Sequence, residues 1–169
     1  MDNPINLVLR ALQFLWTLLI MALTGNMIAE AIGGNASIVN YCMFVAVISM
    51  LALFYLFTVS IKPDFAILPI LPLVLDALLT LFFLIGGIAL AAELNVHSCS
   101  SSDYLKGNHV INGSKNQGKR CHEAQAVCAF LWFGFAAYMG SLVFSALGAR
   151  GGSMPGRKFR GGAPAMSQV

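Results

Sequence analysis

The sequence predicts an all-α membrane protein folded as a bundle of four transmembrane helices. Its 169 residues are 58% hydrophobic and only 10% charged, whereas about 25% of the residues in a typical soluble domain are charged. Four apolar stretches are each long enough to cross the hydrocarbon core of a bilayer, which takes about 20 predominantly apolar residues in a helix. Because only one polar connection between them is long, we expect a single membrane domain.

The predicted spans follow the apolar stretches in order along the chain. We place them at residues 5–29, 38–59, 67–92 and 122–147. Pro63 interrupts the short turn between the second and third spans, and a segment rich in Ser, Asn, Gly and Lys separates the third from the fourth. The membrane domain therefore covers residues 1–147. Residues 148–169 are expected to form a flexible basic tail, because they hold too few apolar residues to fold alone.

The distribution of basic residues predicts which side of the membrane the chain ends face. Four spans place both termini on one side, and basic residues in short segments favour the cytoplasmic side. The two sets are Arg10, Lys62, Arg150, Arg157, Lys158 and Arg160 on the side of the termini, and Lys106, Lys115, Lys119 and Arg120 on the other. Two glycosylation sequons, at Asn35 and Asn112, then lie outside. The sequence therefore predicts cytoplasmic termini.

Asp76 is the acidic residue predicted to lie deepest inside a span. It follows the start of the third stretch by about nine residues, which at about 1.5 Å of helical rise each places it near the bilayer midplane. Its functional interpretation is a proton or cation relay, or recognition of a lipid or partner helix. The structural alternative, a protonated carboxyl hydrogen-bonded inside the bundle, is favoured because a transport path needs several ionisable groups in series. Candidate partners at similar depth are Gln13 or Thr17, Ser49 and Tyr138.

Basic residues near the predicted membrane boundaries are expected to face the lipid headgroups. Arg10, near the start of the first span, can extend its long side chain to the interface. Basic residues of the tail lie beside the inner leaflet, where each gains about 1 kcal/mol from anionic lipid. Their alternative role is to determine the topology alone. The tail residues are Arg150, Arg157, Lys158 and Arg160.

Cys99 and Cys121 bracket the long polar loop, which is predicted to lie outside. In an oxidising compartment, two cysteines placed in this way most simply form a disulfide. A metal site is the alternative, since His97 and His122 lie beside the cysteines and two Cys with two His form an acceptable zinc set. The compartment favours the disulfide, which would tie the outer ends of the third and fourth spans together.

The sequence lacks the residue patterns of an enzyme active site. It contains no nucleophile and base pair, no glycine-rich phosphate loop and no HExxH motif, and its three histidines all lie in or beside the long loop. We therefore expect no catalysis, no cofactor and no bound metal. The formal net charge of +3 gives no indication of nucleic-acid binding.

Several short strings along the chain are distinctive. They are NLVLRALQF opening the first span, VNYCMF opening the second, HSC closing the third, RCHEAQA opening the fourth, and the terminal SQV. Together they resemble the fungal non-classical export protein family, a branch of the MARVEL-domain tetraspan proteins. The resemblance covers nearly the whole chain, with Cys99 and Cys121 at the matching loop ends and Asp76 in the matching span. The tail departs from it, because its basic run is less dense.

The resemblance implies a plasma-membrane protein of the furrow-like fungal domains called eisosomes, which helps to organise them and responds to sphingolipids. It also implies an association with the secretion of proteins that lack a signal peptide. We therefore expect sphingolipid-rich or anionic membrane lipids as partners, with eisosome coat proteins and further copies of the chain as additional candidates. The alternative hypothesis is a small transporter or channel-like export component that uses Asp76.

Overall fold

Helices make up most of the described part of the chain. The computed structural model describes residues 4–62, 68, 70–95 and 97–150. The helices are α1 (Pro4–Ala29), α2 (Ser37–Ile61), α3 (Leu71–Leu94), α4 (Ser102–Gly107) and α5 (Gln117–Arg150). All but the short α4 are long and apolar enough to cross a membrane. The predicted all-α, four-span architecture is therefore confirmed.

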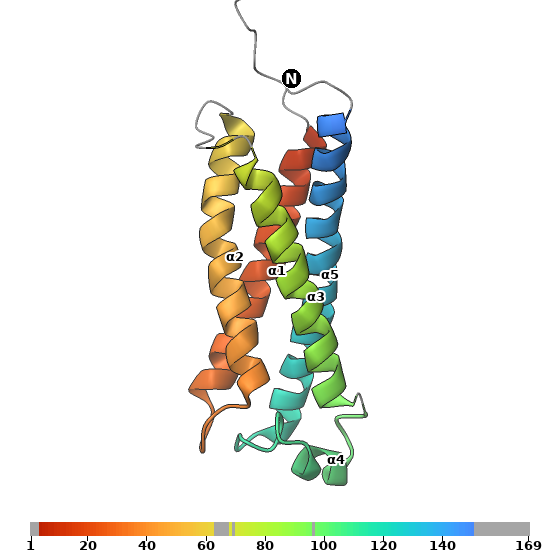
Figure 1. The fold of residues 1–169 in the computed structure, drawn as a ribbon. Coiled ribbons are helices and arrows are strands. Elements are labelled where there is room, and N and C mark those ends of the chain that lie inside the picture. Colours follow the sequence, from red (N-terminus) through yellow and green to blue (C-terminus); the bar gives the residue numbers. More distant parts are fainter. Residues whose placement is uncertain (1–3, 63–67, 69, 96, 151–169) are drawn as a thin grey trace, which may run out of the picture.

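The four long helices pack side by side as a bundle (Figure 1). Both α1 and α3 pack against α2 and α5, so α1 and α3 are diagonal to each other, and α2 is diagonal to α5. The start of α1, the end of α2, the start of α3 and the end of α5 lie together at what we call the terminal end. The α1–α2 connection and α4 lie at the opposite end, which we call the loop end (Figure 1).

Two helix starts differ from the prediction by four or more residues. α3 begins at Leu71 instead of residue 67, with Pro72 in its first turn, where the missing N–H of proline is tolerated. α5 begins at Gln117 instead of residue 122, so polar residues of the predicted loop form its first turn. Apolar stretches locate the part of a helix that crosses a membrane, whereas a helix such as α5 continues beyond that part wherever its backbone hydrogen bonds can form. Boundaries inferred from hydropathy are therefore shifted by several residues.

The outward faces of the bundle are apolar. Leu51, Phe54, Ile85, Ile88 and Phe133 are each more than half exposed. Apolar surface of this kind would promote association in water, whereas in a bilayer it contacts lipid chains. The polar residues of the spans are buried inside the bundle instead, which is the arrangement that a hydrocarbon surrounding requires.

The contact between α3 and α5 depends on a glycine. Gly134 on α5 faces the ring of Phe83 on α3, and a Cβ atom at position 134 would lie 2.3 Å from Cε1 of Phe83. Phe83 is fully buried, and its ring centroid lies 5.0 Å from that of Tyr138. Because small residues let helix backbones approach in a membrane, Gly134 makes room for the largest apolar side chain of the core.

Candidate functional site

A buried ion pair joins α1 to α3 near the terminal end. Nη1 of Arg10 donates to Oδ1 of Asp76 at 2.5 Å, and Nη2 donates to Oδ2 at 2.7 Å. Both side chains are almost completely buried. Since α1 and α3 are diagonal helices, this two-pronged contact crosses the interior of the bundle. Paired bonds between a guanidinium and a carboxylate are both strong and geometrically specific.

The ion pair corrects one expectation from the sequence. Arg10 does not extend to the interface but points into the bundle, where its side chain is only 3% exposed. The physical reason is the cost of an isolated charge in hydrocarbon, which each residue of the pair lowers by binding the other. Asp76 follows the start of α3 at Leu71 by five residues, a helical rise of about 7.5 Å, and its depth in a bilayer stays a prediction.

Gln13 extends the ion pair toward α5. Its Oε1 accepts a hydrogen bond from Nη1 of Arg10 at 2.9 Å. Its Nε2 donates to the carbonyl of Ala137 at 3.1 Å and to the hydroxyl of Ser141 at 2.9 Å. The amide therefore links the charged pair to the neighbouring helix, and all three of its partners are buried.

A second set of polar contacts crosses the other diagonal. The hydroxyls of Ser49 on α2 and Tyr138 on α5 share a hydrogen bond of 2.5 Å, and Ser49 also contacts the hydroxyl of Thr17 on α1 at 3.1 Å. All three residues are fully buried. Together with Arg10, Asp76, Gln13 and Ser141, they form what we call the polar network, to which each spanning helix contributes.

The residues predicted to lie inside the membrane are therefore in the core, but their bonding differs from the expectation. Gln13, Ser49 and Tyr138 are fully buried, yet the carboxylate of Asp76 is bound by Arg10. Sequence reasoning missed Arg10 as the partner. One polar atom of the network remains unsatisfied, since Nε of Arg10 is buried and has no hydrogen-bond partner among the described residues.

The loop end is held together by a disulfide and a buried arginine. Cys99 and Cys121 are bonded, with their Cα atoms 5.8 Å apart. Arg120, beside Cys121, is 1% exposed and donates to the carbonyls of Val110 and Met27 at 2.7 and 2.6 Å. Its Nη2 donates to Oδ1 of Asn35 at 2.9 Å. One side chain thus connects the end of α1, the α1–α2 loop and the segment before α5.

Because Cys99 and Cys121 are bonded to each other, the alternative zinc site has no thiolates to bind a metal. His97 instead packs edge-on against Tyr104, with ring centroids 5.3 Å apart, and its carbonyl accepts a hydrogen bond from Gln125. Within the described ranges, no three His, Cys, Asp or Glu side chains gather closely enough to hold a metal ion. Free Cys42 and Cys128 are buried in the bundle.

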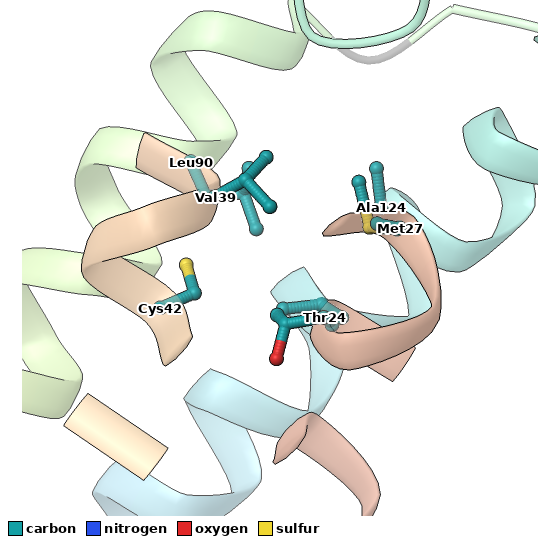
Figure 2. Close-up of a pocket in the computed structure, with 7 residues that line it drawn as sticks. Thr24, Met27, Val39, Cys42, Leu90 and Ala124 are labelled. Atoms are coloured by element: carbon teal, nitrogen blue, oxygen red, sulfur yellow. The ribbon is translucent and has the colours of Figure 1, made fainter. Parts of the chain in front are cut away.

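A small gap inside the bundle lies on the side of the loop end. Figure 2 shows six of its lining residues: Thr24, Met27, Val39, Cys42, Leu90 and Ala124. The lining is apolar except for the hydroxyl of Thr24, which donates to the carbonyl of Ile20. Because the gap has no space for even one water molecule, it is a packing irregularity and not a ligand site.

The predicted lipid-binding tail falls almost entirely outside the described residues. Arg150 is the last residue of α5. Arg157, Lys158 and Arg160 lie beyond it, outside the described part of the chain. Contact of these four residues with the inner leaflet therefore stays a prediction.

A four-span bundle with polar groups inside and apolar side chains outside is the architecture of an integral membrane domain. Residues 4–144 match the MARVEL family, described as a membrane-associating domain. The chain therefore belongs to the MARVEL family of multi-pass membrane proteins. No solved structure matches the chain.

Within this class, the chain is similar to fungal proteins over nearly its whole length. It is 34% identical over 168 residues to non-classical export protein 102 of Candida albicans, with 97% of each chain covered. It is 33% identical over 172 residues to non-classical export protein 2 of Saccharomyces cerevisiae, with 96% of each chain covered. A homolog of the latter in Schizosaccharomyces pombe is 30% identical over 155 residues, which cover 91% of this chain and 82% of the relative. The chain belongs to the non-classical export protein family, as the resemblance indicated.

Proposed function

We propose that this protein is a plasma-membrane tetraspan organiser of eisosome-type membrane domains, which responds to sphingolipids and takes part in non-classical protein export. The names of its relatives support the link to export. The roles in eisosomes and in sphingolipid response follow from the resemblance of the sequence strings to the family. In this proposal the protein acts through its shape and its lipid contacts, without catalysis.

The observation that carries the proposal is the division between the interior and the surface of the bundle. The interior polar groups are bonded to one another across both diagonals, and the gap inside the bundle is too small for a ligand. The outward faces present large apolar side chains. A bundle closed in this way contacts its surroundings through its lipid-facing surface and its two ends.

The proposed orientation places the terminal end in the cytoplasm and the loop end outside. The excess of basic residues on the side of the termini supports it. The disulfide at the loop end also supports it, because disulfides persist in oxidising compartments. In this orientation the basic tail meets the inner leaflet, where anionic lipids and eisosome coat proteins are its candidate partners.

The proposal is tested by imaging the tagged full chain in a living fungal cell before and after sphingolipid synthesis is blocked. We expect static patches at the plasma membrane that disperse within minutes of the block. Patches that persist unchanged after the block would contradict the proposed response to sphingolipids. A uniform distribution before the block would contradict the role as a domain organiser.

The alternative, a small transporter or channel-like component, requires Asp76 to exchange a proton or cation. A buried charge inside a span is the observation that favours it. In this conformation, however, both carboxylate oxygens are bound by Arg10. The test measures substrate flux in reconstituted vesicles. Flux with the unmodified chain and none with the Asp76→Asn variant would favour a transporter over an organiser.

A further inference from the structure

We propose that Asn112 is the site of an N-linked glycan and that Asn35, which starts the other sequon, is left unmodified. This inference rests on the orientation proposed above, with the loop end outside. The two sequons are equivalent as sequence patterns, because both are Asn-X-Ser with X other than proline. The structure distinguishes them by exposure, by bonding and by reach from the membrane.

Asn112 is free to carry a large substituent. Its side chain is exposed, and its Nδ2 makes only a long contact of 3.4 Å to the carbonyl of Lys106. The residue lies between α4 and α5, in the segment that the disulfide closes. A glycan at Nδ2 would therefore project from the loop end without displacing a buried group.

Asn35 is held by a buried residue and stands close to a span. Its Oδ1 accepts a hydrogen bond from Nη2 of Arg120, which is itself 1% exposed. A glycan on the same amide group would have to fit beside that contact. Asn35 also precedes α2 by only two residues, so the chain can carry it at most about 7 Å from the start of that helix.

The reach of Asn112 is much greater before the loop folds. Counted to the predicted apolar stretches, Asn112 precedes residue 122 by ten residues and Asn35 precedes residue 38 by three. These lengths of chain span up to about 35 Å and about 10 Å when extended. The glycosyl-transferring enzyme is embedded in the membrane and reads an extended acceptor at a distance from the bilayer. Asn112 therefore has the longer reach from the membrane toward such an active site, and Asn35 is held close to the bilayer.

The folded loop implies that the modification precedes folding. Ser114, the hydroxyl residue of the sequon, is 5% exposed, its Oγ accepts the N–H of Asn116, and it pairs with Ala31 across an isolated β-bridge. The enzyme cannot engage this hydroxyl once the loop has closed. Glycosylation of Asn112 therefore competes with loop closure and with formation of the Cys99–Cys121 disulfide.

The reaction uses an oligosaccharide linked to a membrane lipid through pyrophosphate as the donor. Nδ2 of Asn112 forms a bond to the anomeric carbon of the first sugar, and the bond from that carbon to the pyrophosphate oxygen breaks. The lipid pyrophosphate leaves with the bonding electron pair, and a base accepts one proton from the amide nitrogen. The reaction involves no change of oxidation state.

The experiment expresses the tagged full chain in a fungal cell and compares its electrophoretic mobility before and after treatment with an N-glycosidase. We expect a glycosidase-sensitive shift that Asn112→Gln abolishes and that the matched variant Asn35→Gln retains. Replacing both Cys99 and Cys121 with serine should raise the glycosylated fraction, because the loop stays open longer. The inference would be overturned if glycosidase treatment left the mobility of the unmodified chain unchanged. It would also be overturned if the Asn112→Gln variant still showed the glycosidase-sensitive shift.

A second variant separates this inference from the orientation on which it rests. It carries an added, well-spaced acceptor sequon in an extension inserted between Ser101 and Ser102, before α4 at the loop end. Modification of the inserted sequon without modification of Asn112 would overturn the inference and leave the orientation intact. Absence of modification at both sites would overturn the orientation and the inference together.

Discussion

At the scale of single residues, the Arg10–Asp76 pair is a buried ion pair whose two charges depend on each other. Removing one partner of a buried ion pair leaves the other charge uncompensated, which costs about 3–5 kcal/mol, whereas replacing both partners by apolar residues is often neutral. We expect Asp76→Leu to lower the free energy of unfolding by about 3–5 kcal/mol, and the double variant Arg10→Met/Asp76→Leu to recover most of that loss. Denaturant unfolding in detergent micelles, followed by circular dichroism, measures both.

The control for these single and double variants is Ile85→Leu on the lipid-facing surface. Ile85 is 51% exposed, and the substitution keeps the side-chain volume. Its unfolding should match that of the unmodified chain. If the losses of Arg10→Met and Asp76→Leu simply added in the double variant, the two side chains would not act as a pair.

Gly134 provides a second prediction at this scale. A Cβ atom there would lie 2.3 Å from the ring of Phe83, whereas at Gly140 it would lie at an ordinary 3.5 Å from Cδ2 of Leu9. We expect Gly134→Ala to lower the free energy of unfolding by about 1–3 kcal/mol through overpacking, and Gly140→Ala to leave it nearly unchanged. Thermal unfolding of the two variants side by side measures the difference, and equal melting temperatures would contradict the packing argument.

At the scale of the elements, Arg120 connects segments that the helices alone leave apart. Its three acceptors belong to α1, to the α1–α2 loop and to the segment before α5. Lysine has a single charged nitrogen and cannot reproduce this planar fork. We therefore expect Arg120→Lys to cost roughly 1–3 kcal/mol, the penalty of leaving a buried acceptor without its partner. Amide hydrogen exchange should accelerate in residues 30–36 and 108–116.

The neighbouring residue Lys119 is the matched control for Arg120. It is 44% exposed at its side chain and pairs with Glu30 on the surface, where ion pairs contribute little. Lys119→Ala should leave amide exchange at the loop end unchanged. If Arg120→Lys also left the exchange of both segments unchanged, the buried contacts would not hold the loop end together.

The spans could be predicted from the sequence because an apolar stretch of about 20 residues is stable as a helix across a bilayer. The partner of Asp76 could not, because hydropathy is counted along one helix and Arg10 lies 66 residues away. The signal of matching depth appears only once the helix starts are known, since Arg10 follows the start of α1 by six residues and Asp76 follows the start of α3 by five. For Arg120 no comparable signal exists, because two of its acceptors are backbone carbonyls.

At the scale of the whole molecule, the polar network crosses both diagonals of the bundle. The Arg10–Asp76 pair joins α1 to α3, and the Ser49–Tyr138 bond joins α2 to α5. These diagonal contacts add to the packing between neighbouring helices in fixing the relative positions of all four helices. The network therefore defines the shape of the surface that the lipids meet, although none of its members faces them.

This separation of interior and surface gives a prediction that distinguishes the organiser from the transporter. The variant Arg10→Met/Asp76→Leu removes the charged pair, yet it keeps the fold, because both charges are replaced together, and it keeps the lipid-facing side chains. An organiser that acts through its surface should still form plasma-membrane patches that disperse when sphingolipid synthesis is blocked. A transporter that uses Asp76 should lose its activity entirely. Imaging the double variant beside the unmodified chain, with unfolding measured on the same purified proteins, decides between them. Patch loss in a variant that remains folded would show that the ion pair has a role beyond holding the helices together.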